Sequence, residues 1–249
     1  MELITKHNRK SIYRDGDRII KIFEEGYTKS SILQEAYNQS VIETSEINAP
    51  KVLQVTNMDN KWAIISEFIP GKTLQQLMNE NPEKSDEYLD LLVDVQMKIL
   101  YAEIDIPLRK LKDKMKYKIN GSNFDSSVKY ELNARIEATP NHSKVCHGSL
   151  NPMNIILREG DNKPFVLDWF HVTQGNASAD AARTYLLLCI ENSKELAESY
   201  LNKFCERTNT DRAYVERWIP VVAATQYMKE INNENERNIL ESWINVCEY

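Results

Sequence analysis

CHGSLNPMNIIL at residues 146–157 and FVLDW at residues 165–169 are the two stretches that decide the fold of this chain. Each contains a short apolar run, and the polar turn EGDN at residues 159–162 separates the two runs. This arrangement predicts two short strands joined as a hairpin. Asn154 begins the first strand and Asp168 follows the second, so the hairpin is expected to bring an amide oxygen and a carboxylate together. Their oxygens are of the kind that Mg²⁺ prefers. The spacing alone nevertheless favours a turn residue at Asn154 and a capping residue at Asp168.

Outward from this hairpin, the chain divides into two parts with different periodicities. The first part predicts strands around a single helix at residues 28–44, whereas apolar residues recur at helical spacing from residues 85–101 onward. We therefore expect an α+β fold of the two-lobed, protein-kinase-like kind, with a small β-rich lobe at residues 1–69 and a larger helical lobe at residues 70–249. The expected strands of the smaller lobe are residues 11–14, 18–23, 51–56 and 62–68.

Composition excludes several classes of protein. The formal net charge of −6 argues against nucleic acid or an acidic membrane surface as the main partner, because both attract an excess of Lys and Arg. The longest apolar run, residues 185–190, is too short to span a bilayer, and the N-terminus lacks the apolar segment of a secretory signal. We expect a cytoplasmic protein with reduced thiols, because its cysteines are too widely spaced for a zinc site or a disulfide framework. These cysteines are Cys146, Cys189, Cys205 and Cys247.

The expected smaller lobe contains a lysine inside an apolar strand and a glutamate in its helix. Lys21 lies within RIIKIF at residues 18–23, and Glu35 lies on the helix, with Glu43 as a weaker alternative partner. A lone lysine in such a strand usually faces solvent. Further along, EFIPGKTL at residues 67–74 ends the last strand of this lobe.

Together, these motifs resemble those of the aminoglycoside phosphotransferase and choline kinase family. Residues 147–154 and 166–169 match the family pattern H-G-D-x-x-x-x-N, followed by two apolar residues and D-W, in order and spacing, except at one position. The resemblance implies that Asn154 and Asp168 hold Mg²⁺ during phosphoryl transfer. It also implies that residues 67–74 are the hinge that contacts the nucleotide base.

The same resemblance assigns roles in the smaller lobe. It implies that Lys21 holds the α- and β-phosphates of the nucleotide and pairs with Glu35. It also implies that adenine hydrogen-bonds to the backbone near Glu67 and Ile69. The loop at residues 7–17 departs from the kinase pattern, because it contains Gly16 alone instead of a G-x-G-x-x-G motif.

Ser149 is the exceptional position, because the family has aspartate after His-Gly. That aspartate accepts the proton of the substrate hydroxyl, and general-base help of this kind is typically worth about 10²–10⁴-fold in rate. An unactivated serine is a poor base at neutral pH, and His147, two residues earlier, is expected to be structural. A hydrolase nucleophile is rejected, because the G-x-S-x-G pattern around Ser149 is missing.

The resemblance implies a phosphotransferase that binds Mg²⁺ with ATP or GTP in the cleft between its lobes. It would transfer the γ-phosphate to a hydroxyl of a small molecule such as an aminoglycoside, an amino alcohol or a sugar. Two alternatives stay open: a catalytically silent pseudokinase that acts as a nucleotide-responsive binding module, and a protein in which Ser149 replaces a natural aspartate. The acceptor site is expected in the helical lobe, but no motif identifies the acceptor. Glu234 and Glu241 could form an acidic cluster for a cationic one, although acids on exposed helices are usually only solvated.

Overall fold

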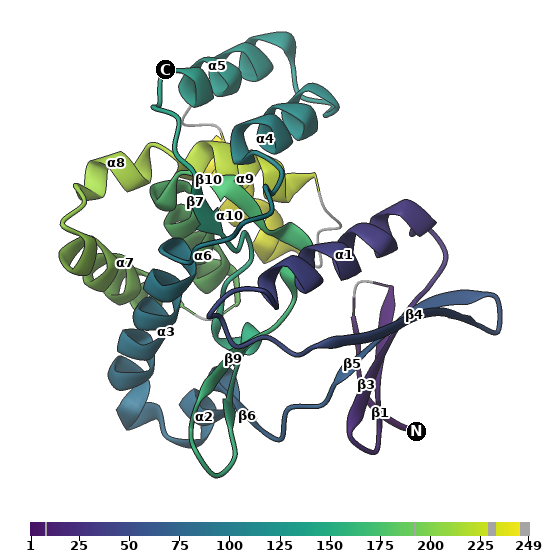
Figure 1. The fold of residues 1–249 in the computed structure, drawn as a ribbon. Helices are drawn as coiled ribbons and strands as arrows, with labels where there is room; N and C mark the ends of the chain where they lie inside the picture. Colours follow the sequence, from purple (N-terminus) through teal and green to yellow (C-terminus); the bar gives the residue numbers. More distant parts are fainter. Residues whose placement is uncertain (8, 192, 229–232, 245–249) are drawn as a thin grey trace. The chain divides into compact units, whose positions relative to one another are not determined.

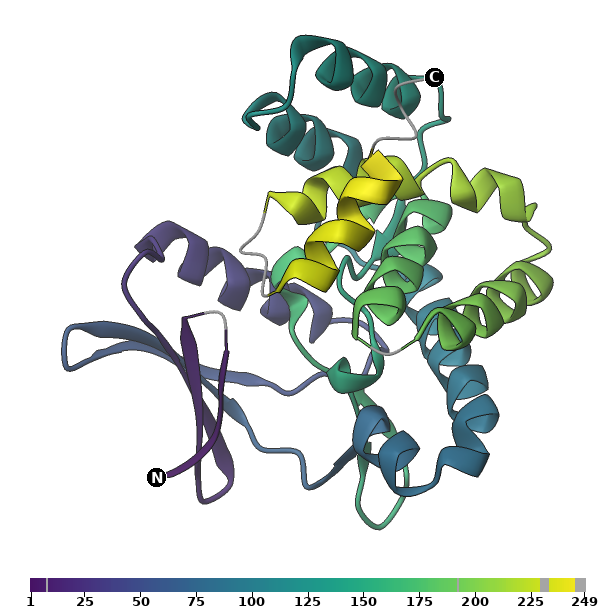
Figure 2. The same ribbon diagram turned by 180° about the vertical axis from the view of Figure 1, so that it is seen from behind.

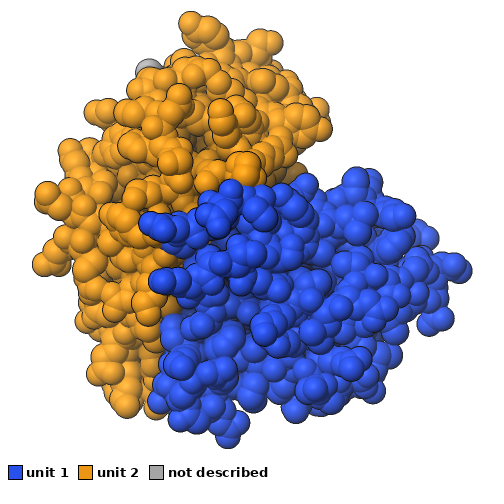
Figure 3. All heavy atoms as spheres, in the orientation of Figure 1, with its two compact units in different colours: residues 1–80, 102–106, 152–171 blue, residues 81–101, 107–151, 172–249 orange. Residues whose placement is uncertain are grey.

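The structure, a computed structural model, describes residues 1–7, 9–191, 193–228 and 233–244. It consists of two compact units, which Figure 3 shows in different colours. The expected boundary between residues 69 and 70 stays a prediction; the compact units divide the chain differently, because the first unit also contains the hairpin that follows Asn154. The first unit comprises residues 1–80, 102–106 and 152–171, and the second comprises residues 81–101, 107–151 and 172–249.

A five-stranded antiparallel sheet forms the larger part of the first unit. Its strand order is β1-β2-β3-β5-β4. Asp15 and Arg18 close the predicted β2–β3 hairpin, and Gly16 adopts a φ of 64°, which favours glycine in the turn. The first strand was not predicted. The strands are β1 (Glu2–His7), β2 (Lys10–Asp15), β3 (Arg18–Phe23), β4 (Val52–Met58) and β5 (Lys61–Glu67).

Helix α1 (Lys29–Ile42) packs against this sheet and confirms the predicted helix. Thr28 caps its N-terminus, because the Thr28 hydroxyl accepts a hydrogen bond from the Ser31 N–H at 3.2 Å. Burying a large apolar side chain such as Ile32 of α1 typically contributes about 1.5–3 kcal/mol. The core residues that join α1 to the sheet are Phe23, Ile32, Ala36 and Ile64.

A three-stranded sheet of order β6-β8-β9 completes the first unit. The predicted hairpin is confirmed as β8 (Ile155–Arg158) and β9 (Pro164–Val166), whereas β6 (Gly71–Thr73) and the short helix α2 (Leu74–Glu80) were not predicted. Gly71 has a φ of 149°, and a Cβ at this position would lie 2.0 Å from the Leu157 carbonyl oxygen. Only glycine therefore allows β6 to approach β8 this closely.

The second unit is mainly helical. Its helix α6 is buried continuously from Ser178 to Leu188 and packs against four other helices, α7, α8, α9 and α10 (Figure 2). Two short strands, β7 (Lys144–Cys146) and β10 (Thr173–Gly175), pair with each other and were not predicted. The helices are α3 (Ser85–Leu100), α4 (Leu111–Asn120), α5 (Ser126–Glu137), α6 (Ala177–Glu191), α7 (Lys194–Thr208), α8 (Arg212–Glu216), α9 (Ile219–Tyr227) and α10 (Glu234–Ile244).

The expected fold class is confirmed as α+β, with a β-rich N-terminal sheet and a helical C-terminal part. Cys146, Cys189 and Cys205 are free thiols, and Cys247 lies outside the described residues. Within the described ranges, no helix combines the length and the hydropathy needed to cross a membrane.

Candidate functional site

Lys21 forms an ion-pair cluster with two carboxylates in the first unit. Its Nζ lies 2.7 Å from Glu35 Oε1 and 3.4 Å from Asp168 Oδ1. The Lys21 side chain is 18% exposed and that of Glu35 only 2%. Burial alone would lower the pKa of Lys21, but the two carboxylates outweigh it and raise this pKa above its ordinary value. Lys21 is therefore held as a cation in a mostly buried position.

Lys10 is a second lysine that forms an ion pair with Glu35, and no motif in the sequence indicated this role. Its Nζ lies 3.1 Å from Glu35 Oε2, so each carboxylate oxygen of Glu35 contacts its own ammonium group. The Lys10 Nζ also lies 5.0–5.4 Å from the centroids of three aromatic rings, a cation–π arrangement. Lys10 pairs with Phe23 across the β2–β3 hairpin, one residue before the strand expected at residues 11–14. The three rings belong to Phe23, Tyr27 and Phe170.

The β8–β9 hairpin brings Asn154 and Asp168 to the same end of one sheet. Ile155 pairs with Val166, and the Leu167 N–H donates to the Asn154 carbonyl at 2.8 Å. Asp168 follows directly, with a φ of 62° in the left-handed region that few non-glycine residues adopt. Backbone strain of this kind is concentrated at functional sites, and aspartate is one of the residues that tolerate it.

The expected hinge lies where β5 ends. The Glu67 N–H donates to the Lys51 carbonyl at 3.0 Å, whereas the Lys51 N–H donates to the Glu67 side chain at 3.1 Å. The backbone carbonyl of Glu67 therefore does not accept the Lys51 N–H, which donates to the Glu67 side chain instead. Ile69 is buried, and within the described part of the chain its N–H makes no hydrogen bond.

Ser149 lies in a tightly anchored loop of the second unit. Its N–H donates to Nδ1 of His147 at 3.2 Å, and the His147 side chain is fully buried. Asp180 accepts hydrogen bonds from the Gly148 N–H at 2.7 Å and from Gln96 Nε2 at 3.0 Å. Burial raises the pKa of Asp180, and these two donors act in the opposite direction. Asp180 therefore anchors the loop, and His147 is held by hydrogen bonding in the interior.

Two oxygen donors suit the metal that the resemblance implies. Mg²⁺ usually takes one or two protein carboxylates and completes its shell with phosphates and water. Asn154 and the one-third-exposed carboxylate of Asp168 fit that demand. The described residues contain no group of three or more acidic, histidine or cysteine side chains that could form a protein-only metal cage.

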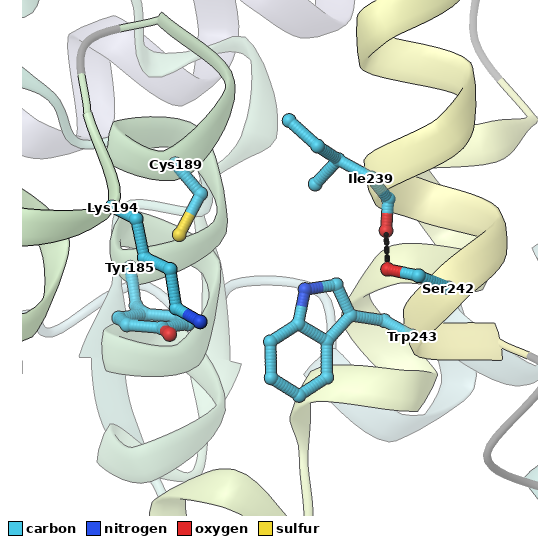
Figure 4. A pocket seen from close by; sticks show the side chains of 6 residues that line it. All are labelled: Tyr185, Cys189, Lys194, Ile239, Ser242 and Trp243. Carbon is cyan, nitrogen blue, oxygen red and sulfur yellow. Dashed lines mark hydrogen bonds between the residues drawn. The ribbon is translucent and has the colours of Figure 1, made fainter.

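A pocket of about 210 Å³ lies elsewhere, in the second unit (Figure 4). Its wall is largely apolar, with the rings of Tyr185 and Trp243 packed edge to face at 6.2 Å. None of the expected site residues lines it, and its lining contains no carboxylate. We therefore place the candidate site at Lys21, Glu35 and Asp168. The pocket is lined by Tyr185, Cys189, Lys194, Ile239, Ser242 and Trp243.

These features, a β-rich N-terminal sheet with a strand lysine paired to a helix glutamate and a following helical part, define a kinase-like phosphotransferase fold. Residues 7–217 match the model of the phosphotransferase enzyme family, and the chain belongs to this family. No curated protein matches the chain significantly.

Solved structures of aminoglycoside phosphotransferases share the fold. A thermostable mutant of APH(4)-Ia, in a ternary complex with ADP and hygromycin B, is 13% identical with a TM-score of 0.73, over 99% of this chain and 92% of that one. APH(3'')-Id from Streptomyces rimosus is 16% identical with a TM-score of 0.64, over 90% and 92% of the two chains. ADP-bound APH(2'')-Ib is 13% identical with a TM-score of 0.62, over 98% and 91%.

Proposed function

We propose that this chain binds a nucleoside triphosphate, ATP or GTP, together with Mg²⁺. The observation that carries the proposal is the contact of Lys21 Nζ with both Glu35 and Asp168. A lysine fixed in this way presents a positive charge to phosphate oxygens beside a carboxylate suited to Mg²⁺. In support, two of the structurally similar phosphotransferases were crystallised with ADP.

Each expected site residue has a separate part in this proposal. Lys21 neutralises phosphate charge, and Glu35 holds Lys21 in place. Asn154 and Asp168 would hold the Mg²⁺ ion, which supplies charge neutralisation on the phosphates when bound. The adenine would hydrogen-bond to the backbone near Glu67 and Ile69. The Lys51 N–H donates to the Glu67 side chain instead of to its carbonyl, and the Ile69 N–H makes no hydrogen bond within the described residues.

The second part of the proposal is slow transfer of the γ-phosphate to a hydroxyl group of a small acceptor. Ser149 stands five residues before Asn154, where the family pattern has the aspartate that accepts the hydroxyl proton. His147 does not replace it, because Nδ1 of this buried ring accepts the Ser149 N–H. Phosphoryl transfer depends mostly on positioning and charge neutralisation, so loss of the base slows the reaction without abolishing it.

A catalytically silent, nucleotide-responsive binding module is the second candidate, and Ser149 is the observation that favours it. Nucleotide turnover separates the two functions. Phosphate release from Mg·ATP and Mg·GTP would be measured with and without a panel of amino alcohols, sugars and aminoglycosides. Turnover stimulated by one hydroxyl compound supports the transferase, whereas nucleotide binding with no stimulation supports the binding module.

A further inference from the structure

Lys10 is a cation of the first unit that the proposed function does not yet use. It begins β2 and pairs with Phe23 of β3, two residues beyond Lys21. Its Nζ lies 3.1 Å from Glu35 Oε2, and the Nζ of Lys21 lies 2.7 Å from Glu35 Oε1. Two ammonium groups from neighbouring strands therefore contact the two oxygens of one carboxylate.

The ammonium group of Lys10 is largely buried and surrounded by aromatic side chains. The Lys10 side chain is 15% exposed. Its Nζ lies 5.0–5.4 Å from the ring centroids of Phe23, Tyr27 and Phe170. Phe170 is two residues beyond Asp168, so this contact fixes Lys10 beside the segment that carries the proposed Mg²⁺ ligand.

Lys10 keeps hydrogen-bonding capacity after it has bound Glu35. An ammonium group has three N–H donors. Among the residues that the structure describes, the Lys10 Nζ makes a hydrogen bond to Glu35 only. The aromatic rings attract its charge but are weak acceptors, whereas a phosphate oxygen is a strong acceptor for a charged donor. Lys10 can therefore bind a phosphate without releasing Glu35.

The charge balance of the cluster also favours a phosphate ligand. Lys10 and Lys21 face two carboxylates, those of Glu35 and Asp168. In the proposed function, Asp168 binds Mg²⁺ when the nucleotide is present, so its charge then balances the metal ion. The buried Glu35 is left opposite two ammonium groups. A phosphate chain would compensate this excess positive charge, and the interaction is strong because water is largely excluded there.

The sequence before Lys21 contains no glycine-rich loop that could hold the phosphates. In protein kinases, such a loop covers the phosphates of the nucleotide. Gly16 is the only glycine before Lys21, and it lies in the turn between β2 and β3. The ammonium group of Lys10 can supply through its charge what a glycine-rich loop supplies through its backbone N–H groups.

We propose that Lys10 binds the phosphate chain of the nucleotide together with Lys21 and takes the place of a glycine-rich loop. The inference rests on the proposed function, because it assigns a further residue to the same nucleotide site. Lys10 keeps its contact with Glu35 and donates its other N–H groups to phosphate oxygens. The competing explanation is that Lys10 only holds Glu35 and acts on the nucleotide through Lys21, so the experiment must separate these two roles.

Ligands that differ only in their phosphates test the proposal. The tighter-binding of Mg·ATP and Mg·GTP, the corresponding diphosphate and the nucleoside alone would be titrated by calorimetry at constant ionic strength. The proteins are the full chain, Lys10→Gln and the control Lys61→Gln. Lys61 is a suitable control, because it lies on the same sheet and forms an ion pair with Glu24. Lys10→Met provides a second variant if Lys10→Gln does not fold.

A second background separates contact with phosphate from an effect through Glu35. Glu35→Gln removes the carboxylate that joins the two lysines. A Lys10 that only holds Glu35 loses its effect in this background, whereas a Lys10 that binds phosphate keeps it. Combining Glu35→Gln with Lys10→Gln leaves no carboxylate at residue 35, so the double variant avoids the cost of a buried charge that has lost a partner.

We expect Lys10→Gln to weaken binding of the triphosphate and diphosphate roughly tenfold or more in both backgrounds, as for the loss of one charged hydrogen bond. Binding of the nucleoside, and all binding by Lys61→Gln, should stay unchanged. Unchanged triphosphate affinity in Lys10→Gln, a loss confined to the unmodified background, or an equal loss for the nucleoside would overturn the proposal while the proposed function stands. No nucleotide binding by the unmodified chain would contradict the proposed function, and this inference with it.

Discussion

The Lys21 cluster of the first unit and the Ser149 loop of the second differ in how their charges are balanced. In the first unit, Lys10 and Lys21 share the carboxylate of Glu35, and Lys21 also contacts Asp168. In the second unit, the position to which the family pattern assigns a carboxylate is Ser149. The part proposed to bind phosphate keeps the kinase pattern, whereas the part proposed to activate the hydroxyl has serine in place of aspartate. Nucleotide binding and turnover should therefore be separable by mutation.

The largest effect is expected from restoring a carboxylate at residue 149. Ser149→Asp should raise phosphoryl transfer by about 10²–10⁴-fold, because it supplies the general base at a position that the loop already anchors. Turnover would be measured with the acceptor panel present, since without an acceptor the base has only water to orient. Ser127→Asp, a change at an exposed position of α5, is the matched control. Fast turnover by the unmodified chain, or a nucleotide-bound Ser149→Asp protein that stays inactive, would show that this position is not the limiting difference.

Removing the side chain of Lys21 tests the proposed phosphate-binding role of the Lys21–Glu35–Asp168 cluster. Lys21→Ala should weaken nucleotide binding roughly 10- to 100-fold, as expected for the loss of a charged hydrogen bond to phosphate. The fold should persist, because Lys10 still pairs with the buried Glu35. Lys61→Ala, at a partly exposed ion pair with Glu24 on the same sheet, is the control. If Lys21→Ala unfolds part of the protein while the folded fraction keeps its affinity, the phosphate role of Lys21 is wrong.

A smaller effect is expected from removing Asp168, the proposed Mg²⁺ ligand of the same cluster. Asp168→Ala should reduce the dependence of nucleotide affinity on Mg²⁺ severalfold, because it removes the main carboxylate ligand. Affinity would be titrated with and without Mg²⁺. Asp161→Ala, in the turn between β8 and β9, removes an acid that pairs with Arg158 and serves as control. An unchanged Mg²⁺ dependence in Asp168→Ala would place the metal on other ligands.

The smallest effect concerns the contribution of Lys118 on α4 to stability, because burial lowers the pKa of this lysine. The folded pKa of Lys118, about 8, lies below its ordinary value of 10.5, so between these values the unfolded chain binds more protons. Stability should therefore rise with pH in this range, on the order of 1 kcal/mol for a half-buried group. Urea unfolding at about pH 7 and about pH 9.5 measures the rise. Lys118→Gln should lose part of it, and an identical pH dependence in both proteins would contradict the assignment.

Local sequence patterns predicted the parts of the site that depend on neighbouring residues. The β8–β9 hairpin was visible from two apolar runs and a polar turn, and it brings Asn154 and Asp168 to one end of a sheet. Glu35 was visible because the β-rich part has a single helix. The metal, phosphate and hinge roles of these residues stay predictions.

Other contacts could not be predicted from the sequence, because they depend on packing between residues that are far apart in the chain. Lys10 lies in a polar N-terminal segment, and its aromatic surroundings include Phe170, which is distant in sequence. The pairing of β7 with β10 joins three-residue strands that are far apart in the chain, so neither has a periodic signal of its own. The burial of Arg183 depends on α9, which no motif connects to α6.

Thermal unfolding with nucleotide tests the central claim most directly. The claim is that the Lys21–Glu35–Asp168 cluster binds a nucleoside triphosphate with Mg²⁺. A ligand that binds only the native state must raise the melting temperature, so millimolar Mg·ATP or Mg·GTP should raise Tm of the unmodified chain. The account predicts a clear rise with at least one nucleotide and a much smaller rise in Lys21→Ala. No shift with either nucleotide, or an equal shift in both proteins, would contradict it.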